Sequence, residues 1–221
     1  MHKSIKNLIE INKEIKTKIS ELDFKNYNPQ IIAVSKTFNI DYISHIINYG
    51  HIHFGENKVQ EAIEKWSDIK NNFENIKLHM VGKLQTNKVK HVIPLFDYIH
   101  SLDNLKLAEK IANEQSKKNR KIKIFIQINI ANESQKSGIH KDKIESFYKI
   151  CHNDLGLNII GLMCLPPKNI ADEKYFSEMF NLSRKIKLSD LSMGMSNDYI
   201  SAIKYRSTFL RIGSKIFGSR V

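Results

Sequence analysis

The sequence predicts an α/β protein, a single (β/α)8 barrel of the TIM type with an extra N-terminal helix, and three observations support this. Eight short apolar runs alternate with stretches of helical periodicity along the chain. The length of 221 residues suits an economical barrel that forms one domain, residues 1–221. Polar and glycine residues repeatedly follow the apolar runs. A doubly wound open sheet competes, but it seldom needs so many units in so short a chain.

The chain begins with an amphipathic segment, in which five apolar residues recur at helical spacing: Ile5, Leu8, Ile15, Ile19 and Leu22. The predicted strands are short apolar runs, and they span residues 31–35, 51–55, 78–82, 98–101, 123–129, 158–164, 190–194 and 209–212. The predicted helices between them span residues 41–49, 57–70, 84–95, 104–117, 141–152, 171–187 and 197–205. After the last strand, residues 213–218 predict a short helix.

Composition narrows the class of protein. The net charge of +12 would suit a nucleic-acid binder, but the basic residues are spread along helical polar faces, so we expect a solvated surface and no nucleic acid. No segment approaches the roughly 20 apolar residues of a membrane span, and the N-terminus lacks a signal peptide's apolar stretch. Cys151 and Cys164 share no motif spacing, which favours a reduced, cytoplasmic protein. We expect a monomer.

Lys36 is the first candidate for chemistry, because it closes the apolar run that begins at Ile31. Strand alternation places Ile32, Val34 and Lys36 on one face, with the lysine as the last inward-pointing residue. Desolvation of an ammonium group at that position favours the neutral amine, which attacks aldehydes. A lysine that leaves the strand into water is the alternative.

Other candidate residues follow other strands and so belong to the same rim, where barrel enzymes place their sites. Gly213 allows close backbone approach, Ser214 begins a helix, and Ser196 lies in the preceding loop; bare amides at such a turn bind phosphate. Arg211 lies between apolar residues within a strand, where a guanidinium needs a specific partner: a ligand, or a carboxylate across the barrel. An amine, a phosphate site and an inward arginine together suit pyridoxal 5′-phosphate (PLP).

Several motifs occur in one order along nearly the whole chain: Ala33-Val34-Ser35-Lys36-Thr37, Phe54-Gly55-Glu56-Asn57, Gly82-Lys83-Leu84-Gln85-Thr86-Asn87-Lys88, Gln127-Ile128-Asn129, Lys136-Ser137-Gly138, Gly161-Leu162-Met163, Ser192-Met193-Gly194-Met195-Ser196 and Arg211-Ile212-Gly213-Ser214. Through them the sequence resembles the pyridoxal phosphate homeostasis protein family. The tail Ser219-Arg220-Val221 departs from the family's usual ending.

The resemblance implies the barrel shared with the N-terminal domain of bacterial alanine racemases, and a Schiff base between PLP and Lys36. It further implies phosphate contacts from Ser196, Gly213 and Ser214, with Arg211 at the pyridine nitrogen and Asn57 beside the cofactor. The implied function is to carry and buffer PLP and to deliver it to apo-enzymes, in intracellular vitamin B6 homeostasis, without established turnover.

Two enzymatic alternatives stay open. A PLP-dependent amino-acid racemase of low activity would need an opposite-face acid from Tyr199, Tyr205 or a rim histidine. It would also need a second domain, for which the sequence leaves no residues. A metal-dependent hydrolase is suggested by His51 and His53, which share a face of the predicted strand, but two histidines do not close a metal site. We expect both, and His79, to be structural.

Lys136, in the loop after the fifth strand, is a second amine on the rim. It could take up an aldehyde transiently as a cofactor enters or leaves, or it could be an ordinary solvated lysine. A nucleic-acid binder, argued from charge alone, is the non-enzymatic alternative and would show a steep salt dependence.

Overall fold

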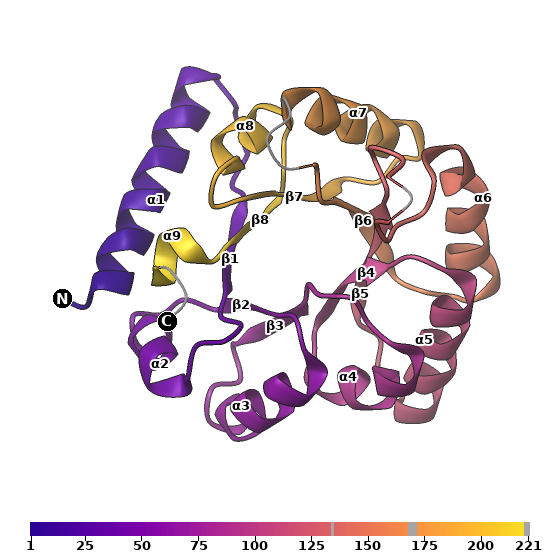
Figure 1. The fold of residues 1–221 in the computed structure, drawn as a ribbon, viewed down its shortest axis with the longest axis horizontal. Coiled ribbons are helices and arrows are strands. Elements are labelled where there is room, and N and C mark those ends of the chain that lie inside the picture. The colour runs from indigo at the N-terminus through magenta and orange to yellow at the C-terminus, as the bar shows by residue number, and fades with distance from the viewer. Residues whose placement is uncertain (134, 168–171, 219–221) are drawn as a thin grey trace.

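The computed structural model describes residues 1–133, 135–167 and 172–218, and its centre is a closed barrel of eight parallel strands (Figure 1). The strands are β1 (Gln30–Val34), β2 (His53–Glu56), β3 (Lys77–Met80), β4 (Tyr98–Leu102), β5 (Lys123–Ile128), β6 (Ile159–Cys164), β7 (Asp190–Met195) and β8 (Phe209–Ile212). Each strand pairs with the next along the chain, and β8 closes onto β1. The predicted fold class is confirmed.

Helices surround the barrel in the order of the chain (Figure 1). The α-helices are α1 (Lys3–Glu21), α2 (Ile40–Asn48), α3 (Val59–Asn72), α4 (Val89–Leu95), α5 (Leu105–Lys118), α6 (Ile144–Lys149), α7 (Asp172–Lys185), α8 (Tyr199–Lys204) and α9 (Ser214–Phe217). Two short 3-10 turns, η1 (Thr86–Lys88) and η2 (Lys141–Lys143), precede α4 and α6, and a π-helical turn, η3 (Ile150–Asp154), follows α6. The predicted helices 84–95 and 141–152 are therefore composite.

Two predicted strands have different limits, and both differences affect candidate residues. Strand β1 ends at Val34, so the prediction that Lys36 is the last strand residue is wrong; Lys36 lies in the turn that follows. Strand β2 begins at His53, so His51 precedes the strand and does not share a strand face with His53. The ring of His51 instead bonds the backbone oxygen of His53 at 2.9 Å. Apolar character alone does not show at which residue the backbone hydrogen bonds between neighbouring strands begin or end, so these limits were misplaced.

Alternation along the strands creates two separate apolar layers. Six buried side chains fill the barrel interior: Ile32, Val34, Tyr98, Phe125, Met163 and Phe209. The intervening residues, such as Ile31 and Ala33 of β1, face the helices and belong to the larger outer core. The interior is therefore a packed core and not a pore.

The extra helix α1 lies outside the ring of helices, beside α8 and α9 (Figure 1). Its buried face consists of Leu8, Ile11 and Ile15. Glu14 of the same helix pairs with Lys215 of α9 at 2.7 Å and accepts a hydrogen bond from the hydroxyl of Tyr199. Helix α1 therefore anchors the turn that follows the last strand.

The helices and the two cysteines can be compared with what the composition predicts. In the described ranges, no helix has the length and apolar character that crossing a bilayer requires. Cys151 and Cys164 are free and buried. Burial raises the pKa of Cys151 to about 12, so this thiol stays neutral and unreactive.

A buried charge cluster joins the carboxyl ends of β1 and β2 to α3. The carboxylate of Glu56 is fully buried, and its Oε1 accepts hydrogen bonds from the Ser35 hydroxyl at 2.7 Å, from Lys65 at 3.0 Å and from the Trp66 indole at 3.0 Å. A carboxylate in such a position needs these donors, because an isolated buried charge is very costly.

The same cluster reaches both neighbours of Lys36. The ammonium of Lys65 also donates to the carbonyl of Ser35 at 3.0 Å and to Glu61 at 3.1 Å. Glu61 in turn accepts the backbone N–H of Thr37 at 2.7 Å. Residues on either side of Lys36 are therefore fixed by helix α3.

Replacement of Lys65 by methionine should destabilise the protein strongly, because it leaves the Glu56 charge buried without its cation. We expect the free energy of unfolding to fall by about 3–5 kcal/mol, as for other broken buried pairs. Urea denaturation measures it. The double variant K65M/E56Q, which removes both charges, should recover most of the loss; a single variant within about 1 kcal/mol of wild type would contradict the prediction.

Candidate functional site

A cavity of about 800 Å³ opens at the carboxyl ends of the strands, and all six predicted binding residues line it: Lys36, Asn57, Ser196, Arg211, Gly213 and Ser214. They come from segments that follow β1, β2, β7 and β8, and from β8 itself. These segments are distant in sequence and meet because parallel strands end at the same rim. The predicted residues are thus brought together at one site.

Lys36 enters this cavity from the turn after β1, where it is half-buried. Strand alternation continues into the turn, since Val34 also lines the cavity. The backbone N–H of Ser35 still donates to Gly55 at 3.0 Å, which extends the pairing of β1 with β2 by one residue. The amine is therefore carried by a backbone that is fixed on both sides.

One corner of the cavity is built from small donors where the segments after β7 and β8 meet. The hydroxyl oxygen of Ser196 accepts the backbone N–H of Gly213 at 3.3 Å and that of Lys215 at 3.2 Å. A Cβ atom at Gly213 would lie 3.3 Å from the carbonyl oxygen of Val34, so this backbone runs close to β1. Ser214 adds a second hydroxyl to the lining. The corner is suited to a phosphate group.

Arg211 points into the barrel from β8 and is only 5% exposed. Its Nη1 donates to the hydroxyl of Ser192 at 2.5 Å, and its Nη2 donates to the carbonyl of Cys164 at 2.8 Å. Both of these partners are neutral groups, whereas the predicted alternative was a carboxylate across the barrel. Burial lowers the pKa of Arg211 from its ordinary value. The guanidinium has further N–H donors, and it also lines the cavity.

Asn57 is positioned by an unusually close backbone contact. A Cβ atom at Gly82 would lie 2.3 Å from the carbonyl oxygen of Asn57, which leaves no room for a side chain. Gly82 follows β3 and belongs to the motif of residues 82–88. The glycine of that motif therefore keeps the segment after β2 in place at the rim.

Part of the cavity lining was not predicted from the sequence. Leu165, Pro166 and Pro167 follow β6 and line the cavity, as do Phe38 and Val81 and the residues near Ser196: Met195, Asn197 and Asp198. The Pro-Pro pair after the predicted strand 158–164 was the feature of the sequence that could have pointed to this part of the rim. Asp198 is the one carboxylate among the described lining residues, and its Oδ1 accepts the backbone N–H of Met195.

Several other candidate residues lie elsewhere. Lys136 does not line the cavity and pairs with Glu133 at 2.6 Å. The hydroxyl of Tyr199 faces Glu14 and Lys215 between α1 and α9, and Tyr205 is not part of the lining. The C-terminal tail, residues 219–221, lies outside the described residues.

The metal-site alternative concerns the histidines. His53 and His79 are buried in the barrel. Over the described ranges, no cluster of three or more potential ligand side chains is arranged to hold a metal ion.

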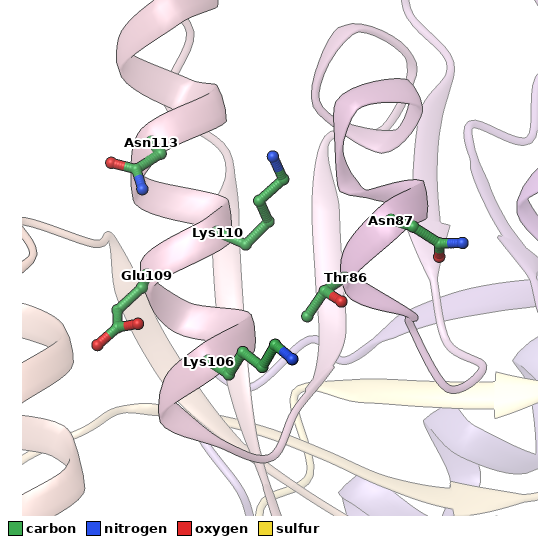
Figure 2. A pocket seen from close by; sticks show the side chains of 6 residues that line it. All are labelled: Thr86, Asn87, Lys106, Glu109, Lys110 and Asn113. Carbon is green, nitrogen blue, oxygen red and sulfur yellow. The ribbon is translucent and has the colours of Figure 1, made fainter.

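A second, smaller hollow of about 320 Å³ lies between η1 and α5, on the helical exterior (Figure 2). Lys106, Lys110 and Thr86 extend into it, whereas Glu109 points away (Figure 2). Lys110 is paired with Glu114 at 2.9 Å. This hollow contains none of the predicted site residues and is a groove between neighbouring helical segments.

Comparisons with known proteins agree with the fold. Residues 13–221 match the family model described as alanine racemase, N-terminal domain. The pyridoxal phosphate homeostasis protein of Haemophilus influenzae is 36% identical over 224 residues, which cover 97% of this chain and 94% of that protein. The protein of the same name from Buchnera aphidicola subsp. Schizaphis graminum is 36% identical over 228 residues, covering 97% and 99%.

Solved structures give the same result. PipY of Synechococcus elongatus, determined with PLP bound, has a TM-score of 0.81 and 28% identity, over 92% of this chain and 100% of that one. An alanine racemase of Clostridium difficile has a TM-score of 0.69 at 13% identity, and the match covers 94% of this chain and 57% of the racemase. The second likeness concerns the fold alone.

The fold and the site define a barrel of the alanine racemase N-terminal domain class. Within this class the chain belongs to the pyridoxal phosphate homeostasis protein family. The relatives carry the name of a homeostasis protein and not of an enzyme.

Proposed function

We propose that this chain binds PLP in the large cavity through Lys36, and that it stores the cofactor and delivers it to apo-enzymes. We propose further that it acts in the cytoplasm, as a single-domain monomer, without turning over amino acids. One observation carries the proposal: a primary amine, a corner of hydroxyl and amide donors and a buried guanidinium line one cavity. The name of its relatives and the PLP-bound structure of PipY support it.

Each part of the cavity matches one chemical group of PLP. The amine of Lys36 would attack the aldehyde carbon and expel water, which leaves a Schiff base. Ser196, Gly213 and Ser214 would hold the phosphate, in the corner where the segments after β7 and β8 meet; the Ser196 hydroxyl accepts the Gly213 amide there and keeps its own hydrogen for the phosphate. Arg211 would face the pyridine nitrogen, with Asn57 beside the ring. The bound cofactor supplies an electrophilic carbon and an electron-withdrawing ring.

The same residues favour a carrier over a racemase. Arginine stays protonated, so it leaves the pyridine nitrogen largely unprotonated and weakens the ring as an electron sink. Tyr199 and Tyr205 do not line the cavity, so neither is placed as the acid of the opposite face. Asp198 is the one described carboxylate of the lining, and its Oδ1 is already held by the amide of Met195. A racemase of low activity would have to use it.

The Lys36→Ala variant should lose the visible absorption band of the bound cofactor and keep its fold, since the half-buried lysine contributes little packing. A spectrum before and after borohydride reduction, with peptide mass mapping, tests this. Lys136→Ala is the matched control and should keep the full band. If Lys136→Ala takes up or releases PLP more slowly than the wild type, Lys136 takes part in transfer. If both rates are unchanged, Lys136 is an ordinary solvated loop lysine. A full band in Lys36→Ala would contradict the assignment.

Gly213→Leu should weaken PLP binding by roughly tenfold or more, because its Cβ atom would press within 3.3 Å of the carbonyl oxygen of Val34 and displace the phosphate corner; binding should be weakened far more than folding. Pyridoxal, which lacks the phosphate, should bind the wild type about a hundredfold more weakly than PLP, since charge-assisted hydrogen bonds are lost. Fluorescence titration of both ligands, with urea denaturation, measures these effects. Equal affinity for pyridoxal and PLP would rule out this phosphate site.

The loaded protein should transfer PLP to an apo-enzyme, and racemisation of alanine or serine should stay near background. Activation of a PLP-dependent apo-enzyme measures the first, and chiral chromatography the second. Turnover above roughly 1 s⁻¹, the lower end of ordinary enzyme rates, that disappears in Lys36→Ala would favour the racemase instead. Asp198→Asn would then show whether the carboxylate of the lining is the base.

A further inference from the structure

A column of three histidines crosses the barrel interior and ends at Arg211. Nδ1 of His53 lies 2.9 Å from Nε2 of His79, and Nδ1 of His79 lies 2.9 Å from Nε2 of His100. Nδ1 of His100 lies 2.8 Å from the hydroxyl oxygen of Ser192, to which Arg211 donates at 2.5 Å. One continuous hydrogen-bonded chain thus joins side chains of β2, β3, β4, β7 and β8.

The column climbs the barrel because of the strand register. His79 is paired with Gly55, two residues beyond His53, and Tyr98 is paired with His79, two residues before His100. On the other side, Ser192 is paired with Phe209, two residues before Arg211. Each step to a neighbouring strand therefore rises toward the carboxyl ends, and the chain leads from the lower part of the barrel to the cavity.

Aromatic rings hold the imidazoles in place. His79 stacks on Tyr98 with ring centres 4.1 Å apart and an interplanar angle of 11°. His100 stacks on Phe125 at 4.4 Å and 20°. Both histidines and Ser192 are fully buried. The rings are thus fixed in plane as well as in position.

The three imidazoles are neutral at physiological pH. Burial lowers the pKa of His79 and of His100 well below its ordinary value, and nearby positive charges add to the effect. Burial lowers the pKa of His53 to about 4, with a contribution from Lys77. A neutral imidazole has one donor and one acceptor nitrogen, so every link in the column must point the same way.

Arg211 decides the direction, because a guanidinium only donates. Its hydrogen occupies one lone pair of Ser192, whose own hydroxyl hydrogen then finds its acceptor at Nδ1 of His100. His100 must donate from Nε2 to His79, and His79 from Nε2 to His53. The opposite direction would bring two donors to Ser192 and leave its hydroxyl hydrogen without a partner in the chain of bonds described above, which is costly in a buried site.

We propose that the column positions Arg211: the guanidinium imposes one hydrogen-bond direction on Ser192 and the three histidines, and they hold it in one orientation toward the cavity. All three histidines are then Nε2–H tautomers. His100 is a positioning residue that acts through Ser192 and does not touch a ligand. The effect on cofactor binding rests on the proposed function, in which Arg211 faces the pyridine nitrogen.

The first test uses the protein without PLP, so it does not depend on the proposed function. Long-range ¹H–¹⁵N correlation spectra at neutral pH should show His53, His79 and His100 as neutral Nε2–H tautomers. Arg211 should give two separate Nη resonances, because its rotation is restricted. An Nδ1–H tautomer or an imidazolium at His100, or rapid rotation of the Arg211 guanidinium, would overturn the proposal.

The second test uses two variants that remove opposite halves of His100. The amide of His100→Asn places an acceptor where Nδ1 lies, so it keeps the bond to Ser192. The amide of His100→Gln reaches the place of Nε2, so it keeps the bond to His79 and leaves Ser192 without its acceptor. Both variants lose one ring, so a purely structural role for His100 would lower their free energy of unfolding alike and would not separate them in binding.

We expect His100→Gln to weaken PLP binding by about tenfold, the cost of one buried unpaired polar group. It should also shift the visible band and merge the Arg211 Nη resonances. His100→Asn should stay within about threefold of wild type, with both resonances resolved. Equal effects of the two variants would refute the positioning role while leaving the proposed function intact. Absence of PLP binding by the wild type would refute the proposed function, and the spectra without PLP would still decide on the column.

Discussion

A guanidinium inside a barrel is the constraint on which the carboxyl end of this structure depends. Arg211 is 5% exposed, and a charged group at that depth is tolerated only with partners in fixed places. Two adjacent strands supply them, through the carbonyl of Cys164 on β6 and the hydroxyl of Ser192 on β7. The segments that follow these two strands line part of the cavity, so the strands that stabilise the arginine also help to build the binding site.

The cluster around Glu56 solves a related problem two strands away from Arg211, on the helix-facing side of β2. There a buried carboxylate collects its donors from β1 and α3, and it thereby fixes the residues that flank Lys36. The Glu56 cluster therefore orders the turn that carries Lys36 into the cavity, and the partners of Arg211 order the guanidinium on β8.

The sequence was sufficient for the architecture and for the place of the site. Short apolar runs identified the eight strands, and the limits of 209–212 agree with β8. The six candidate residues met because parallel strands end at one rim, a property of the topology and not of side-chain detail. The 3-10 and π-helical turns within 84–95 and 141–152 were not predictable. Side-chain periodicity does not distinguish a backbone hydrogen bond over three or five residues from the usual one over four. The link from His100 to Ser192 depends on contact across the barrel, which no local pattern encodes.

The pairing of β8 with β1 has a consequence for biosynthesis. Lys36 leaves the ribosome early, but the backbone against which Gly213 packs, and the donors around Ser196, are assembled only when the last strand closes the barrel. Until then the nascent chain exposes an amine with nothing beside it to retain a phosphate. Under the proposed function, capture of an aldehyde would therefore require the finished barrel, and a growing chain on the ribosome would not compete for the free cofactor.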